Sequence, residues 1–276
     1  MEEEILYHYT SVETLFNILN NTEKRGEAEY IKLRASYFMN MNDPIDCRYF
    51  FSEVKQILAE ENASKDCKDK IENTILDVGI PYIISLSSAK DSLPMWNMYA
   101  QKGHGVSIGL SKKVLDDATH GINNRGGKRQ RTIASSCFCK LYECKYWDTN
   151  DIKEKFVQKY ILDKTDFNNK ITNNDICSIS YLIKHPSFFY EKESRVVFLY
   201  SPYPKLHGCL EHIDFLLPIS SIRKIICGPC IKREMVEAII PSTFNKIITE
   251  ESKIPYTDSS PKRCPLSLLF KKGFKE

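Results

Sequence analysis

The sequence predicts an α+β fold, in which helices are inserted between the strands of a mixed or antiparallel sheet. Short runs of alternating or continuous apolar residues, typical of strands, recur along most of the 276-residue chain. Stretches with apolar residues at helical spacing separate these runs, and no internal repeat or linker divides the chain. We therefore expect a single domain over 1–276, with helical insertions at about 47–77 and 150–184.

The N-terminal elements carry clear start and stop signals. Residues 5–9 form a short β-rich run, and Thr10 with Glu13 has the spacing of a capping box at the start of a helix. Residues 29–37 alternate between apolar and polar side chains, which is typical of a strand with one buried face. The turn signal Asn42–Pro44 ends this strand.

The remaining elements follow from the same patterns. A helix over 93–103 begins near a proline and ends at a glycine, as helices commonly do. We expect further helices at roughly 47–61, 66–77, 150–164, 174–184 and 231–240. We expect further strands at 81–88, 105–110, 133–146, 194–200, 212–217 and 222–227, and a short extended tail.

The composition is that of an ordinary globular protein. Apolar residues make up 42% of the chain, and 39 basic against 36 acidic residues give a net charge of +3. The N-terminus is acidic and lacks the apolar stretch of a secretory signal. No apolar run approaches the roughly 18 residues that a membrane-spanning helix needs. We therefore expect a cytoplasmic protein without a membrane partner.

Cysteines are numerous, but their spacing favours packing over chemistry. Ten cysteines in a chain of this length are mostly small buried hydrophobes in a reducing cytosol. Cys227–Cys230 spells the thioredoxin motif C-G-P-C, yet too few elements follow it for a thioredoxin-like domain. A zinc site joining this pair to Cys137, Cys139 or Cys144 lacks most of the usual ligand spacing. We expect no metal, while a redox role of the motif stays open.

Basic residues gather in one glycine-containing loop. The stretch RGGKRQR (125–131) has four positive charges in seven residues, and Lys140 and Lys145 could extend it. The simpler interpretation is a solvated surface loop. The functional interpretation is a phosphate contact that positions a nucleic-acid acceptor.

Two glutamates and an arginine precede an apolar strand near residue 195. In FFYEKESRVVFLY (188–200), Glu191, Glu193 and Arg195 would share one face if the stretch is extended, with the two acids about 7 Å apart. Such a face is often a solvated edge with a cross-strand ion pair. Repulsion between two neighbouring acids would raise the pKa of one of them, and Arg195 would temper it.

Motifs at several places along the chain occur in a recognisable order. These motifs are Y-H-Y-T (7–10), L-R-A-S and M-N-D-P (33–44), M-W-x-x-Y-A-x-x-G-x-G-V-x-I-G (95–109), K-H with E-x-E-x-R (184–195) and I-x-x-I-x-x-G-P (222–229). Their order resembles a mostly bacterial, uncharacterised family of cytoplasmic proteins over about 5–245. The motif set in turn is similar to ADP-ribosyltransferases, including DarT-type DNA-modifying enzymes and RNA 2′-phosphotransferases.

The resemblance to ADP-ribosyltransferases implies a split sheet core and NAD as substrate. In that superfamily, a first strand supplies a His or Arg, a second strand a Ser, Thr or Tyr, and a later strand the catalytic Glu. The matching residues here are His8 with Thr10, then Ser85 and Ser87 or Tyr99, then Glu193 with Glu191. The second piece departs from the family pattern, because Ser-Leu-Ser stands in place of Ser-Thr-Ser.

The resemblance also implies roles for the two acids. Cleavage of the nicotinamide–ribose bond builds positive charge on the ribose, and a carboxylate beneath the sugar stabilises that charge. Glu193 would do this and accept a hydrogen bond from the ribose 2′-hydroxyl. Glu191 would lie nearer the nucleophile, where it could orient it or take its proton. His8, with the neighbouring Tyr9, would bind the ribose hydroxyls.

Other residues would bind the rest of NAD. Thr10, at an expected helix N-terminus, and Arg34, on the polar face of its strand, would meet the phosphates. Trp96 and Tyr99 would stack on nicotinamide or an acceptor base, although core packing explains their helical spacing equally well.

The function that follows is ADP-ribosyl transfer to a nucleic acid or protein, in a bacterial toxin or phage-defence setting and with an antitoxin or regulator as a further partner. Two alternatives stay open, namely an NAD glycohydrolase and a non-catalytic sensor that binds a nucleotide or protein. The pair Glu191 and Glu193 separates these hypotheses. Transfer to a nucleophile uses both acids, whereas a binding module needs neither.

Overall fold

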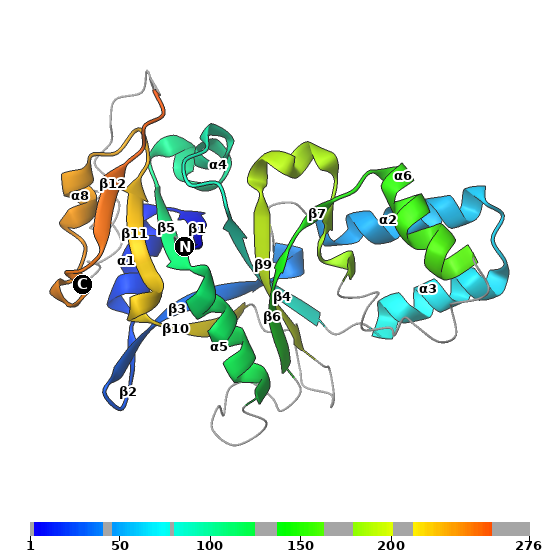
Figure 1. The fold of residues 1–276 in the computed structure, drawn as a ribbon, viewed down its shortest axis with the longest axis horizontal. Coiled ribbons are helices and arrows are strands. Elements are labelled where there is room, and N and C mark those ends of the chain that lie inside the picture. Colours follow the sequence, from blue (N-terminus) through cyan, green and yellow to red (C-terminus); the bar gives the residue numbers. More distant parts are fainter. Residues whose placement is uncertain are drawn as a thin grey trace, which may run out of the picture.

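One mixed sheet organises the part of the chain that the computed structural model describes, which is residues 3–40, 46–77, 80–124, 137–162, 179–200 and 212–255 (Figure 1). The sheet has ten strands in these residues: β1 Ile5–Thr10, β2 Glu23–Arg25, β3 Ala28–Tyr37, β4 Ile80–Ser87, β5 Val106–Ser111, β6 Cys137–Glu143, β9 Glu193–Tyr200, β10 His212–Pro218, β11 Ile222–Cys227 and β12 Ile248–Glu251. Strands β7 (Lys145–Tyr146) and β8 (Ile183–Lys184) form a separate ribbon. The expected α+β class is therefore confirmed.

Helices lie between the strands. They are α1 Val12–Asn20, α2 Asp46–Glu60, α3 Lys65–Asp77, α4 Leu93–Tyr99, α5 Lys112–Asn124, α6 Thr149–Ile152 and α8 Arg233–Glu237. A π-helix, η3 Lys153–Leu162, continues α6. Short 3₁₀ turns are η1 Phe38–Asn40, η2 Gln101–Gly103, η4 Pro186–Glu191, η5 Ile219–Ser221 and η6 Ser242–Phe244.

Strand β4 is where the sheet divides. Along one edge, all of β4 pairs with β9, from Ile80 opposite Tyr200 to Ser87 opposite Glu193. Along the other edge, β1 pairs only with the last residue of β4, where Tyr7 lies opposite Ser87. Strand β3 pairs only with residues near the start of β4. Strands β1 and β3 therefore diverge, and the middle of β4 around Ser85 has no strand partner on that side. This fork creates the space in which the site lies.

Helix α1 packs on the large apolar core that the sheet encloses. Four of its residues are buried, namely Val12, Leu15, Ile18 and Leu19. Ser11 is its N-cap, and the Ser11 hydroxyl accepts a hydrogen bond of 3.0 Å from the Thr14 amide. The predicted Thr10–Glu13 capping box was therefore shifted by one residue. Thr10 is the buried last residue of β1, so it does not cap the helix.

Helix α4 covers the opposite face of β1. Trp96 is fully buried there, donates its indole N–H to Asp91 at 2.6 Å, and packs edge-on against Tyr9 with 4.8 Å between the ring centroids. Tyr9 is buried as well, and its hydroxyl donates to the Ala89 carbonyl at 2.8 Å. This packing fixes α4 above β1 and brings the end of the helix to the fork.

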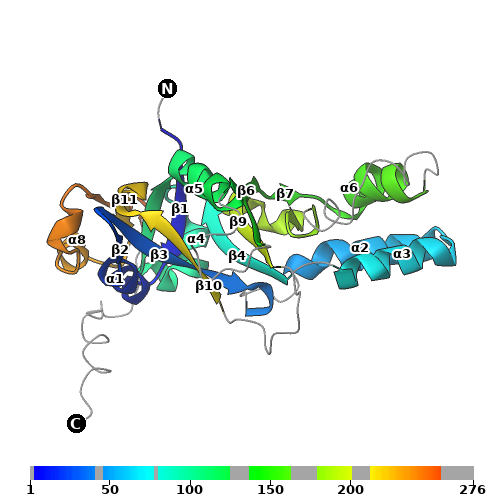
Figure 2. The same ribbon diagram turned by 90° about the horizontal axis from the view of Figure 1, so that it is seen from below.

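Helices α2, α3, α6 and η3 form a lobe that projects from the sheet, as Figure 2 shows. We call them the helical lobe. Their apolar side chains form a core of their own, which includes Phe50, Ile57 and Phe156. Ile183 of β8 belongs to this core, so the β7–β8 ribbon attaches the lobe next to the fork.

Several element predictions need correction. Residues 183–184 form strand β8, although a helix was expected over 174–184. Helix α5 was not expected, and α8 covers only part of the predicted 231–240 helix. The predicted Asn42–Pro44 turn and the basic loop 125–131 lie outside the described residues.

The C-G-P-C motif packs against the glycine-rich turn after α4. The amide of Gly228 donates to the Gly105 carbonyl and the amide of Cys230 to the Gly103 carbonyl, each at 3.0 Å. A Cβ at Gly228 would lie 2.4 Å from the Gly103 oxygen, so glycine is needed for this close approach. Cys227 and Cys230 are buried and are not joined in a disulfide, and burial raises the pKa of Cys227 to about 12. The motif therefore packs two backbone segments together, and burial disfavours ionisation of the Cys227 thiol.

Two kinds of feature are absent from the described residues. None of the helices there is long and apolar enough to cross a membrane. No group of three or more histidine, cysteine or acidic side chains in these ranges could hold a metal ion.

Candidate functional site

A cavity of about 320 Å³ opens at the fork of the sheet. Its wall includes His8 from β1, Arg34 from β3, Ser85 from β4 and Tyr99 from α4. Three further charged residues also line it: Lys184 from β8, Glu191 from η4 and Glu193 from β9. Segments more than 180 residues apart in the sequence thus meet around one hollow.

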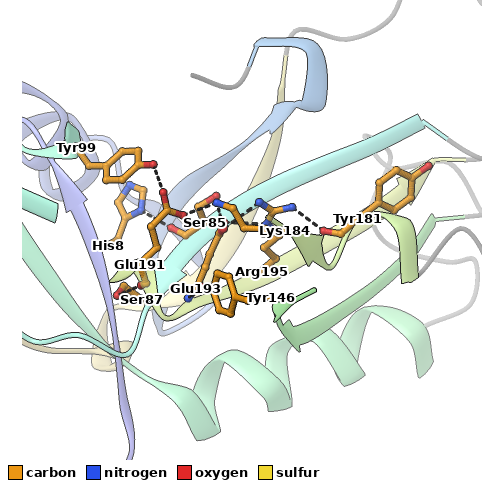
Figure 3. Close-up of polar contacts among 10 residues, drawn as sticks. All are labelled: His8, Ser85, Ser87, Tyr99, Tyr146, Tyr181, Lys184, Glu191, Glu193 and Arg195. Carbon is orange, nitrogen blue, oxygen red and sulfur yellow. Dashed lines mark hydrogen bonds and ion pairs between the residues drawn. The ribbon is translucent and has the colours of Figure 1, made fainter. Parts of the chain in front are cut away.

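Two glutamates and two positively charged side chains form a buried cluster in the cavity wall (Figure 3). Arg195 donates from Nε to Glu193 Oε1 at 2.8 Å and from a terminal nitrogen to Glu193 Oε2 at 2.9 Å. Lys184 donates to both acids, to Glu193 Oε2 at 2.8 Å and to Glu191 Oε2. The Tyr99 hydroxyl donates to Glu191 Oε1 at 2.6 Å. All four charged side chains are buried, so their charges are balanced within the protein.

The two acids do not share a strand face. Glu191 is the last residue of η4, and Lys192 adopts the left-handed conformation with φ of 42° before β9 begins at Glu193. The predicted extended E-x-E geometry was therefore wrong, because a 3₁₀ turn that starts at Pro186 carries the first acid. The turn nevertheless delivers Glu191 to the same cavity as Glu193, where Lys184 bridges them.

Burial and neighbouring charges shift the pKa values of the two acids in opposite directions. Burial opposes ionisation of Glu193, but Arg195 and Lys184 outweigh it and lower its pKa to about 2. Burial raises the pKa of Glu191, and its contacts with Lys184 and Tyr99 offset this only in part. Repulsion by Glu193 is a small contribution to that rise, so desolvation takes the place of the predicted cause. The site holds one firmly ionised carboxylate and one that takes up a proton more readily.

His8 has its tautomer fixed by the fork. Its Nδ1 lies 3.1 Å from the Ser85 carbonyl, which is left without a strand partner on that side. A carbonyl only accepts, so Nδ1 carries the proton and Nε2 is an acceptor in the neutral ring. Burial lowers the pKa of His8, which keeps the ring neutral near pH 7. A neutral ring of this kind can accept a hydrogen bond from a ligand hydroxyl.

Arg34 supplies the cavity with an available cation. It is an exposed residue of β3 that lines the cavity and forms no hydrogen bond or ion pair with the described residues. This contrasts with Arg195, whose guanidinium is fully buried and bound to Glu193. Arg34 is therefore the guanidinium placed to meet an anionic ligand group.

Two of the predicted binding residues have other tasks. The side chain of Trp96 is buried between α4 and β1 and does not line the cavity, so it cannot stack on a ligand. Ser87 donates its hydroxyl to the Glu191 carbonyl at 2.5 Å and accepts from the Ala89 amide at 3.0 Å. Ser87 therefore positions η4 and contributes no wall to the cavity.

The other predicted residues line the cavity in different ways. Thr10 and Tyr9 line it from β1, but both are buried and the Tyr9 hydroxyl is already bonded to Ala89. Ser85 and Tyr99 line it as well, and both reach site residues through hydrogen bonds.

Sequence reasoning missed two residues that organise the acids. Lys184 was part of a recognised motif but received no role, because a helix was expected at its position. The hydroxyl of Tyr146 accepts a hydrogen bond of 2.7 Å from the Glu193 amide and so fixes the start of β9. Its place on a two-residue strand gave no pattern that could reveal it.

Comparison with known proteins gives one match. Residues 95–196 match the model of a family described as "Protein of unknown function (DUF2971)". This agrees with the resemblance to an uncharacterised family, and the matched segment contains Tyr99, Lys184, Glu191 and Glu193. No curated protein and no solved structure matches the chain.

Proposed function

We propose that this protein is an NAD-dependent ADP-ribosyltransferase with a split-sheet core of the ADP-ribosyltransferase type, and that it modifies a macromolecule. One observation carries the proposal. The three strands that bear the predicted motif residues, β1, β4 and β9, are consecutive neighbours in the sheet. His8, Ser85 and Glu193 from these strands line one cavity, together with Glu191.

The ionised acid is suited to the bond-breaking step. The bond between the ribose C1′ and the nicotinamide nitrogen breaks, both electrons leave with nicotinamide, and positive charge grows on the ribose. Glu193 stays ionised at neutral pH, since its pKa is about 2. A carboxylate offers roughly four acceptor positions, and donors from Arg195 and Lys184 take three of them. The free position on Oε1 accepts the ribose 2′-hydroxyl and holds the carboxylate beneath the developing charge.

The second acid is suited to activate the acceptor. A lone pair of the acceptor forms the new bond to C1′, and the proton of the acceptor must leave at the same time. Glu191 takes this proton on a carboxylate oxygen, because it keeps more open acceptor positions than Glu193 and its pKa is raised by burial. A base whose pKa is shifted toward neutrality is effective in such a transfer.

The remaining cavity residues bind the substrate. Nε2 of His8 accepts a hydrogen bond from a ribose hydroxyl, which needs no change in the charge of the ring. Arg34 pairs with the pyrophosphate in a bidentate contact. The cavity thus offers a cation for the phosphates and acceptors for the sugar.

The proposal is tested with NAD labelled in the adenylate half and in nicotinamide. The purified protein is incubated with this NAD and, in separate reactions, with protein, DNA or RNA from a bacterial lysate. We expect nicotinamide release with label on one polymer class. Free ADP-ribose as the sole product would make the protein a glycohydrolase, and no release with any acceptor would overturn the enzymatic proposal.

Matched variants assign the two acids. Glu193→Gln should reduce nicotinamide release at least 100-fold, while Glu191→Gln should reduce transfer far more than release to water. Glu234→Gln is the control, because this glutamate is exposed on α8 and lies outside the cavity. Wild-type turnover by Glu193→Gln would show that the assigned site is wrong.

A further inference from the structure

We propose that Lys184 is a positioning residue that bridges the two acids and leaves Glu191 as the proton-accepting one, with the helical lobe holding Lys184 in place. This inference rests on the proposed function for its catalytic meaning. Its structural part concerns the acid cluster alone.

Lys184 sits at the centre of the cluster. Its side chain is only 5% exposed, and its ammonium group donates to Glu193 at 2.8 Å and to Glu191. The same group lies 5.0 Å from the centre of the Phe188 ring, whose face favours a cation. A buried ammonium in this place holds the two carboxylates close together. Without this positive charge, the two carboxylates would repel each other.

The two acids depend on Lys184 unequally. Glu193 keeps a bidentate partner in Arg195 if Lys184 is removed. Glu191 keeps only the neutral hydroxyl of Tyr99, because Lys184 is the one cation that the described residues place in contact with it. Loss of Lys184 should therefore change Glu191 much more than Glu193.

The position of Lys184 is set by the helical lobe. Its carbonyl accepts from the Trp147 amide at 3.0 Å within the β7–β8 ribbon, and the Trp147 carbonyl accepts from the Tyr49 hydroxyl of α2 at 3.0 Å. Its neighbour Ile183 is fully buried in the core of the lobe. Successive side chains of a strand point to opposite sides, so the lobe holds Ile183 while Lys184 faces the acids.

All charged and titratable groups around Glu191 enter the expected pH behaviour. In the part of the chain that the structure describes, they are Tyr99 from α4, Lys184 from β8, Glu193 and Arg195 from β9, Tyr190 from η4 itself, Tyr146 from β7, and, in the cavity wall, Tyr7, His8 and Tyr9 from β1 and Arg34 from β3. Removing one positive charge from this set makes ionisation of Glu191 harder. Its pKa, already raised by burial, should rise further in Lys184→Met.

The first experiment needs no enzymatic activity. The protein is labelled with ¹³C at the glutamate carboxyl carbons, and the Glu191 signal, assigned with Glu191→Gln, is titrated in the wild type and in Lys184→Met. We expect its midpoint to move up by about one pH unit or more, as loss of a close opposite charge commonly does. Lys140→Met, which removes an exposed cation on β6 outside the cavity, should leave the midpoint unchanged.

The second experiment links the cluster to catalysis. Transfer requires ionised Glu191, so the rate rises with pH through its pKa, and the rise should move to higher pH in Lys184→Met. Lys184→Arg keeps the positive charge and should retain a titration midpoint close to the wild type even if the rate falls. Ethylammonium added to Lys184→Ala should restore part of the lost rate.

The outcomes separate the two proposals. If the wild type releases no nicotinamide, the proposed function fails, but the carboxyl titration still tests the role of Lys184. An unchanged Glu191 midpoint in folded Lys184→Met would overturn that role. If Lys184→Met does not fold, a Glu191 midpoint in Lys184→Arg shifted as far as one pH unit would overturn it instead.

Discussion

The hydroxyl of Tyr99 donates a hydrogen bond of 2.6 Å to Oε1 of Glu191, although the two residues are 92 positions apart in the sequence. This contact joins α4 to η4 in the wall of the cavity. It also stabilises the ionised form of the acid to which we assign proton transfer.

Tyr99→Phe should weaken transfer more than nicotinamide release. The variant keeps the ring but removes the donor, so the pKa of Glu191 should rise and a smaller fraction of this base is ionised at a given pH. We expect transfer to fall about 10-fold at pH 7, as loss of one hydrogen bond to a charged group suggests, and to recover at higher pH. Tyr30→Phe on β3 is the control, and an equal loss in both variants would contradict the assigned contact.

His8→Ala should raise KM for NAD about 2- to 10-fold, which corresponds to one neutral hydrogen bond of roughly 0.5–1.5 kcal/mol. Because the pKa of His8 is lowered, the ring is neutral above pH 6.5, and KM should show no step there in the wild type. Initial rates from pH 6.5 to 9 measure this. His120→Ala, which removes an exposed histidine of α5, should behave as the wild type.

Arg34→Gln should weaken binding of every ligand that carries the pyrophosphate. We expect higher dissociation constants for NAD and ADP-ribose but not for nicotinamide, because Arg34 is assigned to the phosphates alone. Isothermal titration calorimetry compares the three ligands, with Arg25→Gln in the exposed β2 strand as the control. An equal loss of affinity for all three ligands would show that Arg34 does not act through the phosphates.

Arg195→Met should destabilise the fold at neutral pH. Arg195 is fully buried and bound to Glu193 through both carboxylate oxygens, and loss of one partner of a buried pair costs about 3–5 kcal/mol. Urea unfolding at pH 7 measures the loss.

The pH dependence of that loss has a defined sign. In the wild type, the pKa of Glu193 is lowered from 4.5 to about 2, so its stabilising contribution is present above pH 4.5 and lost as pH falls toward 2. In Arg195→Met this contribution is reduced at neutral pH, because only Lys184 still pairs with Glu193, so the difference in unfolding free energy between the two proteins should shrink on acidification. A constant difference from pH 7 to pH 3 would contradict the ion-pair assignment.

Gly228→Ala should destabilise the protein by about 1–3 kcal/mol, the usual cost of overpacking. The added Cβ would lie 2.4 Å from the Gly103 oxygen and force two backbone segments apart.

Cys227→Ser should leave nicotinamide release insensitive to oxidants or reductants, as in the wild type. Redox-dependent activity of the wild type would restore a chemical role to the C-G-P-C motif.

Much of the sheet could be predicted because its strands carry strong local signals. The alternation in β3 and the apolar runs of β4, β9 and β11 matched strands within one or two residues of the predicted ends. The helix expected at 150–164 matches α6 and its continuation to Leu162, although its π-helical form was not expected. The two-residue strand β8 was missed, because a segment this short depends on tertiary contacts and leaves no periodicity.

The candidate site was predictable in part of its membership but not in its geometry. The types and order of His8, Glu191 and Glu193 were enough to expect them around one hollow, and they do line one cavity. The left-handed Lys192, which places Glu191 on a turn, is not apparent from residue type, since lysine rarely adopts that conformation. Lys184 escaped notice because its role depends on a strand that forms only against the helical lobe.

The attachment of β8 to the lobe has a practical consequence for anyone who would shorten this protein. A version trimmed to the sheet alone would keep Glu191, Glu193 and Arg195, but it would lose the scaffold that delivers the second cation. Glu193 would still be paired with Arg195, but Glu191 would lie beside it without a cation of its own among the described residues. Minimal forms of this fold should therefore carry either the lobe or a neutral residue in place of one acid.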